Sequence, residues 1–162
     1  MAKHQEEYRL LLKIMSKRVT VVGLGYIGLP TAAFIASKGF NVNGFDINEE
    51  TVETINKGKI HIVEPFLENL VAKVVKSKHL YASILPRASD IYLIAVPTPF
   101  KQEKANISPD ISYVKKAIAS ISKLIKKGDL IIIESTSPVG TSEHVKNMLT
   151  SLRTDLQMPS EE

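Results

Sequence analysis

Short apolar runs alternate with longer amphipathic stretches along most of this chain. The apolar runs predict buried strands at about 17–22, 40–45, 90–96 and 129–134, with a shorter strand near 79–82. The amphipathic stretches predict helices at about 26–38, 48–57, 66–77, 110–126 and 138–150. Because nearly continuous apolar strands alternate with helices, we expect a single-domain α/β fold with a doubly wound parallel sheet covered on both faces.

Both ends of the chain depart from this alternation. The apolar segment Tyr8–Met15 is interrupted by Arg9 and Lys13, so residues 1–16 are expected to form a short helical extension. Residues 17–150 are expected to form the domain itself, with residues 101–108 as a charged loop. From residue 151 to 162 the periodicity is lost and the sequence is polar, which predicts a tail that leads out of this domain.

The first strand runs directly into a Gly-x-Gly-x-x-Gly turn. Gly23 allows a tight turn, Gly25 lets a pyrophosphate approach the backbone, and Gly28 lets the next helix lie close to the strand. Tyr26 and Ile27 would offer backbone N–H groups to the phosphates, while their side chains are expected to pack. A strand before the turn and a helix after it favour a Rossmann-type dinucleotide site.

An acidic residue follows at the spacing that such a site requires. Asp46 ends the second strand, where its carboxylate can accept hydrogen bonds from both hydroxyls of the adenosine ribose. It would also repel a 2′-phosphate, and neither Ile47 nor Asn48 supplies an arginine, so NAD is expected in preference to NADP. In the alternative interpretation Asp46 only caps the helix that starts near Asn48.

Composition excludes several other classes of protein. The 162 residues are 44% hydrophobic and 23% charged, which is typical of one globular domain. The net charge is +4, but no dense basic block with aromatic residues occurs, so nucleic-acid binding is not expected. Cysteine is absent and the four histidines lie far apart, so no disulfide or metal site is expected. No apolar run approaches the roughly 20 residues of a membrane span, and we expect a cytoplasmic protein.

Four segments, in order, resemble one known family. They are Gly-Leu-Gly-Tyr-Ile-Gly-Leu-Pro (23–30), His-Ile-Val-Glu-Pro (61–65), Ala-Val-Pro-Thr-Pro-Phe (95–100) and Glu-Ser-Thr-Ser-Pro-Val-Gly (134–140). This set is similar to the N-terminal, NAD-binding domain of the UDP-glucose/GDP-mannose dehydrogenase family. Within the family, the sequences of these four segments are most similar to those of the members that act on UDP-N-acetyl-D-mannosamine.

The resemblance implies an NAD-dependent oxidation of a UDP-sugar C6 alcohol to a carboxylate in two steps. In the family the second step uses a catalytic cysteine. That cysteine, the central domain and the substrate domain all belong to a region that these 162 residues do not contain. We therefore expect a fragment of the enzyme, or a naturally short relative, that is inactive alone; the full-length enzyme is expected to be a homo-oligomer. Alternatives are a non-catalytic NAD-binding module, or a 6-dehydrogenase of UDP-glucose or UDP-N-acetylglucosamine.

Two further loops follow strands whose carboxyl ends would face the ligand. Val96, Pro97 and Thr98 follow a central strand, and we expect them to contact the cofactor, although a plain strand-terminating turn is the alternative. In the loop that begins at Glu134, we expect Glu134 and Ser135 to lie on the cofactor side.

Thr136 is the one residue of this chain for which we expect a catalytic role. By resemblance it matches a threonine near the nicotinamide that helps to position the water used in hydrolysis, and a hydroxyl can both donate and accept. The alternative is that Ser135 or Thr136 only caps the last helix. His61 and Glu64 invite a catalytic interpretation too, but Glu64 next to Pro65 is better explained as the start of a helix.

Overall fold

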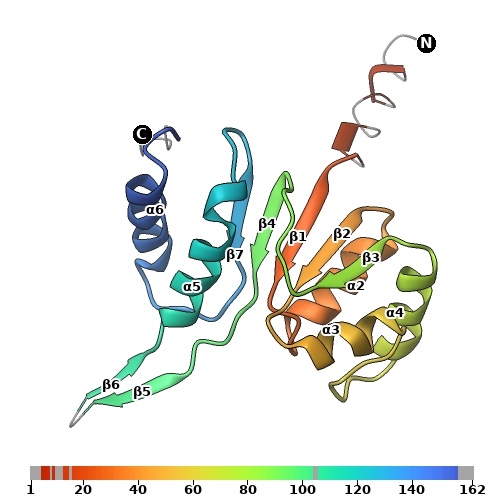
Figure 1. Cartoon of the computed structure of the whole chain (residues 1–162), viewed down its shortest axis with the longest axis horizontal. Helices are drawn as coiled ribbons and strands as arrows, with labels where there is room; N and C mark the ends of the chain where they lie inside the picture. Colours follow the sequence, from red (N-terminus) through yellow and green to blue (C-terminus); the bar gives the residue numbers. More distant parts are fainter. Residues whose placement is uncertain (1–4, 8, 10–12, 15, 104–105, 157–162) are drawn as a thin grey trace.

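A five-stranded parallel sheet forms the centre of the protein. The computed structural model describes residues 5–7, 9, 13–14, 16–103 and 106–156. Its strands are β1 (Arg18–Val22), β2 (Asn41–Phe45), β3 (Leu80–Ser83), β4 (Ile91–Ile94) and β7 (Leu130–Ile133), arranged in the order β3-β2-β1-β4-β7 (Figure 1). All four pairings are parallel. The predicted α/β fold with a doubly wound sheet is confirmed.

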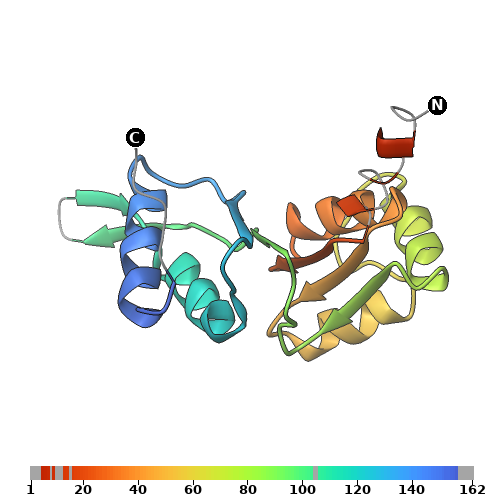
Figure 2. The same cartoon turned by 90° about the horizontal axis from the view of Figure 1, so that it is seen from above.

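Helices cover the two faces of the sheet and create two cores. The helices α2 (Gly28–Ser37), α3 (Glu49–Asn56) and α4 (Leu67–Lys76) pack on one face, where Val21 and Leu29 are fully buried. On the other face lie α5 (Ser112–Ile121), η1 (Ser122–Leu124) and α6 (Thr141–Leu152), around Tyr92 and Ile118 (Figure 2). The edge strand β7 is less well covered, since Leu130 is 52% exposed and Ile132 is 39% exposed.

A β-hairpin replaces the charged loop that was predicted after β4. The strands β5 (Phe100–Glu103) and β6 (Asn106–Pro109) pair in antiparallel fashion and project away from the sheet (Figure 1). At its base the Asp110 N–H donates to the Pro99 carbonyl at 2.7 Å, and Lys101 Nζ lies 3.1 Å from Asp110 Oδ1. The loop prediction was wrong because neither strand carries the alternation of apolar residues that marks a half-buried strand.

Several helix boundaries differ from the predicted ones. The last helix, α6, begins at Thr141 and not at 138, because Gly140 takes a left-handed conformation with φ of 87° just before it. The Thr141 hydroxyl donates to the Pro138 carbonyl at 2.7 Å and closes the turn that precedes the helix. The helix α5 is shorter than predicted, because the chain tightens into η1 and becomes extended at Ile125.

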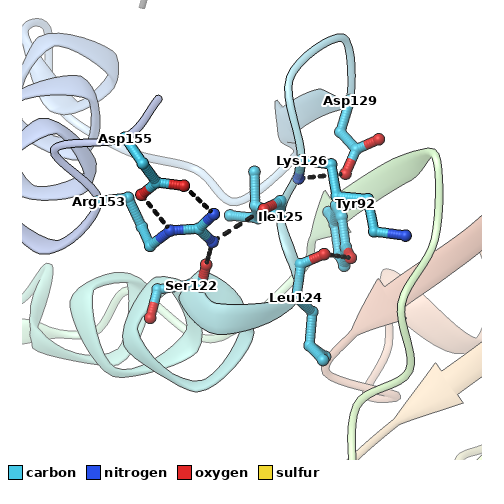
Figure 3. Close-up of polar contacts among 8 residues, drawn as sticks. All are labelled: Tyr92, Ser122, Leu124, Ile125, Lys126, Asp129, Arg153 and Asp155. Atoms are coloured by element: carbon cyan, nitrogen blue, oxygen red, sulfur yellow. Dashed lines mark hydrogen bonds and ion pairs between the residues drawn. The ribbon is translucent and has the colours of Figure 1, made fainter. Parts of the chain in front are cut away.

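Past α6 the chain folds back onto α5 through one arginine. The Arg153 guanidinium donates to the carbonyls of Ser122, the first residue of η1, and Ile125, the residue that follows it, at 2.6 and 2.8 Å (Figure 3). It also pairs with both carboxylate oxygens of Asp155 at 2.7 Å, and this pairing lowers the Asp155 pKa. Leu156 is buried in the adjoining core, so the described part of the polar tail packs against the domain.

At the other end, the described residues that precede β1 are helical at 5–7, 9 and 13–14, and their side chains are exposed. The chain then enters the sheet beside Asp90. This carboxylate accepts hydrogen bonds from the Arg18 N–H and from Lys17 Nζ, both at 2.9 Å. The backbone hydrogen bond from Arg18 is the main reason that the Asp90 pKa is lowered, and Lys17 adds to it.

We expect Asp90→Asn to destabilise the fold by about 1 kcal/mol at pH 7, the scale of one charge-assisted hydrogen bond. Since the Asp90 pKa is lower in the folded protein, its contribution is present above the unfolded pKa and is lost as the pH falls through the folded pKa. Thermal unfolding of both proteins between pH 7 and pH 2 measures the difference. Glu53→Gln, in an exposed pair with Lys57, is the matched control and should change little. A pH-independent effect of Asp90→Asn would contradict the assignment.

Candidate functional site: a dinucleotide site at the carboxyl edge of the sheet

The carboxyl ends of β1, β2, β4 and β7 meet at one edge of the sheet. Backbone hydrogen bonds continue across this edge past the strands themselves. The Gly23 N–H donates to the Phe45 carbonyl at 2.8 Å, and the Glu134 N–H donates to the Ile94 carbonyl at 2.9 Å. The structure thus brings together the glycine turn, Asp46 and the loops at 96–98 and 134–136, which lie far apart in the sequence.

The three glycines of the turn have different surroundings. Gly23 has φ of +90°, and a Cβ there would lie 2.7 Å from the Ala95 carbonyl oxygen. A Cβ on Gly28 would lie 1.8 Å from the Gly23 carbonyl oxygen, which is the close helix–strand approach predicted from the sequence. A Cβ on Gly25 would meet nothing within 4 Å. Sterics inside the protein therefore require glycine at 23 and 28, whereas the space at 25 is open to a ligand.

The amino-terminal end of α2 faces the same edge with its backbone donors uncapped. Its N-cap residue, Ile27, makes no side-chain hydrogen bond to the helix, and no acidic residue lies in the first turn. Tyr26 is 66% exposed and Ile27 is 56% exposed, so the expectation that these side chains pack is wrong within the described structure. Free N–H groups and the helix dipole together favour an anion at this end.

Asp46 is fixed in place by two backbone donors. Its Oδ2 accepts from the Leu24 N–H at 2.8 Å, within the glycine turn, and its Oδ1 accepts from the Asn48 N–H at 2.9 Å. The N-cap of α3 is Asn48, whose own side chain accepts from the Thr51 N–H at 3.1 Å. The capping alternative for Asp46 is therefore wrong. A carboxylate has about four lone-pair positions, so each oxygen can still accept a further hydrogen bond.

Two hydroxyls join the ends of β4 and β7. Ser135 Oγ donates to the Val96 carbonyl at 2.7 Å, and Thr98 Oγ1 donates to the Thr136 carbonyl. Both hydroxyl hydrogens are thus used within the protein, and each oxygen keeps lone pairs that can accept from a ligand. Pro97 is exposed between them. These bonds hold the two predicted loops in fixed positions relative to each other.

Neither Ser135 nor Thr136 caps the last helix. The N-cap of α6 is Gly140, and its first turn is closed by Thr141. The Thr136 side chain is exposed at the edge of the sheet, where it is free of the capping role that was the alternative. A part in positioning water remains a prediction for this residue.

One contact at this edge was missed from the sequence. Thr31, in the first turn of α2, donates its hydroxyl to Glu134 Oε1 at 2.9 Å. This bond joins the helix that follows the glycine turn to the loop that follows β7. Thr31 lies three residues after Gly28, but no pattern in the sequence pairs it with Glu134, 103 residues later.

His61 and Glu64 lie in the exposed loop between α3 and α4. The Leu67 N–H, at the start of α4, donates to the Glu64 carbonyl at 3.3 Å, so Glu64 precedes the helix as expected. Among the described residues, no hydrogen bond or ion pair of either side chain is present. The N-cap position is taken by Phe66, which is 89% exposed with φ of 63°.

Within the ranges that the structure covers, no three histidine, cysteine, aspartate or glutamate side chains are grouped so as to hold a metal ion. In the same ranges, no helix combines the length and the apolar character that crossing a bilayer would need.

Comparison with known proteins decides the family. The sequence model of the UDP-glucose/GDP-mannose dehydrogenase family, NAD binding domain, matches residues 17–160. The chain belongs to this family. The family resemblance stated from the four motifs is thus confirmed, and so is NAD as the cofactor.

The similar proteins of this dehydrogenase family are longer than the chain. A UDP-N-acetyl-D-mannosamine dehydrogenase of Campylobacter jejuni is 53% identical over 142 residues, which are 88% of this chain and 34% of that protein. An NDP-N-acetyl-D-galactosaminuronic acid dehydrogenase of Ralstonia nicotianae is 48% identical over 90% of this chain and 34% of its own length. The solved structure of the UDP-N-acetyl-mannosamine dehydrogenase of Staphylococcus aureus superposes with a TM-score of 0.80 at 42% identity, over 87% of this chain and 34% of that one. The chain thus spans about a third of the length of the relatives it matches.

Proposed function

We propose that this chain is the NAD-binding part of a UDP-N-acetyl-D-mannosamine 6-dehydrogenase. The 53% identity with the Campylobacter jejuni enzyme, over 88% of the chain, is the observation that carries the proposal. The activity would be oxidation of the C6 alcohol of the sugar nucleotide to a carboxylate in two steps, with two NAD reduced.

The geometry at the carboxyl edge fits NAD residue by residue. The open space at Gly25 and the uncapped N–H groups of Tyr26, Ile27 and Gly28 would receive the pyrophosphate. The free lone pairs of Asp46 would accept from the two hydroxyls of the adenosine ribose. Such an arrangement disfavours a 2′-phosphate, because a second negative charge would face the carboxylate.

The loops at 96–98 and 134–136 would hold the nicotinamide end. When bound, NAD supplies the hydride acceptor. The Val96–Thr98 segment and Ser135 present a rigid, hydrogen-bonded surface for the ring, and Glu134 is held by Thr31 on the side of α2. Thr136 would keep a water molecule in place through its hydroxyl, which can donate and accept at once.

Turnover would need groups that these 162 residues do not contain. Cysteine is absent from the sequence, and the thiolate is the nucleophile that the family resemblance implies for the second step. The chain also spans only about a third of its relatives. We therefore propose that the chain alone binds NAD and does not oxidise a sugar nucleotide. The homo-oligomer and the cytoplasmic location that were expected for the full-length enzyme remain predictions.

Calorimetry with NAD and with NADP tests the proposed binding of NAD and the preference for it over NADP. We expect saturable NAD binding and at least about tenfold weaker NADP binding, since about 1.4 kcal/mol of repulsion corresponds to that factor. An absorbance assay for NADH with UDP-N-acetyl-D-mannosamine should show no turnover by this chain. Equal affinity for NADP would contradict the role of Asp46, and measurable turnover would contradict the need for further residues.

The choice of sugar is tested separately in an enzyme that carries this domain. NADH formation would be compared for UDP-N-acetyl-D-mannosamine, UDP-N-acetylgalactosamine, UDP-glucose and UDP-N-acetylglucosamine. The second sugar is included because the Ralstonia nicotianae relative is 48% identical. Preferred oxidation of any of the other three would overturn the substrate assignment and leave the NAD assignment intact.

A further inference from the structure

A basic hollow lies at the amino-terminal edge of the sheet, at the opposite end from the glycine turn. Its volume is about 260 Å³, and the residues at its rim include Arg18 and Asn41, the first residues of β1 and β2, and His79, just before β3. Figure 1 shows this end of β1, β2 and β3 turned away from the β5–β6 hairpin. The dinucleotide site described above uses none of these residues.

The charge of the hollow has one sign. Arg18, Lys78 and Arg87 line it together with His79, and no carboxylate belongs to its lining among the described residues. The nearest acid in the sequence, Asp90, is already engaged with Lys17 and with the Arg18 N–H. Asp90 offsets part of the Arg18 charge, whereas Lys78 and Arg87 have no carboxylate beside them in the lining, and their positive charge favours an anionic ligand.

A buried amide at the base of the hollow lacks partners. Asn43 lies in the middle of β2 and is only 8% exposed, yet in the described structure neither its Nδ2 nor its Oδ1 makes a hydrogen bond. It lines the hollow together with Tyr81, its neighbour in register on β3. A buried amide without partners costs free energy. Both amide atoms are closed to solvent in this structure. A ligand that both accepts and donates a hydrogen bond would therefore remove this cost only after the side chains around Asn43 shift to admit it.

Lys78 occupies a backbone position that favours glycine. It follows α4 with φ of 61°, and the N–H groups of Lys78 and His79 donate to the carbonyls of Val75 and Val74 at 3.0 Å. This is the turn in which helices commonly end on a left-handed glycine. A cation is therefore placed beside the hollow at a conformational cost that glycine would avoid.

The base of the hollow is preorganised. The Arg87 guanidinium lies 4.6 Å from the centre of the Tyr81 ring, which holds it over the sheet. Thr20 Oγ1 donates to the Arg87 carbonyl at 3.1 Å and shares a hydrogen bond with Ser89 Oγ at 2.8 Å. These contacts hold the backbone of the loop that carries Arg87 and Ser89 in place before a ligand binds.

We propose that this hollow binds a small phosphate monoester that also carries hydroxyl groups, such as a sugar phosphate. Lys78, Arg18 and Arg87 pair with the phosphate oxygens. Asn43 donates from Nδ2 to a phosphate oxygen and accepts at Oδ1 from a hydroxyl of the same ligand. Sulfate has no donor for Oδ1, and inorganic phosphate has one only when it is protonated, so both should bind more weakly than the monoester.

A titration followed by ¹H–¹⁵N NMR tests the proposal with the 162-residue chain. Glucose 6-phosphate, inorganic phosphate and sulfate are added separately, at constant ionic strength. We expect saturable shifts of the Asn43 side-chain NH₂ and of the Lys78 and Ser89 amides, with glucose 6-phosphate the tightest of the three. Shifts confined to the Gly23–Gly28 turn, or shifts that grow linearly without saturation, would overturn the proposal. Equal affinity for sulfate would also overturn it, because the Asn43 acceptor would then have no role.

Two variants and a control sharpen the test. Asn43→Leu removes the unpartnered amide at similar volume, so the melting temperature should not fall, while glucose 6-phosphate affinity should drop about fivefold, as for one lost hydrogen bond. Lys78→Gly relieves the left-handed position, so the fold should be at least as stable, while affinity again drops several-fold. Lys76→Gln removes a charge from the exposed end of α4, outside the hollow, and should leave affinity unchanged. If Lys78→Gly and Lys76→Gln weaken binding equally, the site would be non-specific surface charge, and the proposal would fail.

Discussion

Gly28→Ala is expected to abolish stable folding of the domain. The added Cβ would lie 1.8 Å from the Gly23 carbonyl oxygen and 3.2 Å from the Ala95 side chain, so α2 would have to move away from β1. Both contacts belong to the packed core and cannot rotate aside. We expect a loss of at least about 3–4 kcal/mol, a large part of the stability of a domain this size. Circular dichroism during thermal or urea unfolding measures it.

Gly25→Ala is the matched control in the same turn. The added Cβ meets nothing within 4 Å of protein, so the fold should keep its stability to within about 0.5 kcal/mol. NAD affinity should nevertheless fall at least about tenfold, because the methyl group would take space that the pyrophosphate needs. Equal loss of stability in both variants would show that the turn is strained as a whole. Unchanged NAD affinity in Gly25→Ala would place the phosphates elsewhere.

Asp46→Ala is expected to weaken NAD binding by roughly 1–3 kcal/mol, the scale of hydrogen bonds to a charged group. The structure adds a second effect, because the carboxylate also receives the Leu24 and Asn48 N–H groups. Its removal leaves both backbone donors without an acceptor, so the turn itself should loosen. Calorimetry gives the affinity, and hydrogen exchange of the Leu24 and Asn48 amides reports the loosening.

Asp46→Asn separates these two effects. The amide keeps one oxygen acceptor of similar shape but loses the negative charge and the second acceptor. It should therefore keep one of the two backbone bonds and most of the stability, while losing the discrimination against NADP. If Asp46→Asn still rejected NADP as strongly as the native chain, the charge of Asp46 would not be the source of the preference.

The features that could be predicted from the sequence are those set by local pattern and spacing. The order of strands and helices followed from apolar periodicity, and the role of Gly28 followed from its spacing, because only glycine tolerates such an approach between helix and strand. The β5–β6 hairpin was missed because its pairing depends on few apolar residues. The start of α6 was placed too early because Pro138 suits a first turn, whereas the left-handed Gly140 postpones the helix.

In the candidate site, too, residues related by local spacing could be predicted, whereas contacts between distant segments could not. Asp46 and the glycines could be predicted because their spacing along the chain reflects one βαβ unit. The Thr31–Glu134 bond could not, because it joins residues 103 positions apart and depends on how near the start of α2 lies to the loop that follows β7. The bonds from Ser135 and Thr98 to backbone carbonyls are likewise set by the distance between β4 and β7. Asn43 could have been singled out from the sequence, since a polar residue in the middle of a buried strand needs a hydrogen-bond partner.

The exposed flank of β7 bears on how this chain behaves in solution. Within the described ranges it is the last strand of the sheet and pairs only with β4, which leaves a row of backbone donors and acceptors open on its other side. Its sequence, Leu-Ile-Ile-Ile, has no lysine, proline or inward charge, which are the usual residues that protect a sheet edge from pairing with another chain. With Leu130 and Ile132 partly exposed beside it, the strand is a ready template for sheet extension between molecules. Concentrated preparations of the chain alone are therefore most exposed to self-association at this edge, and a lysine substituted at position 132 is the simplest way to suppress it.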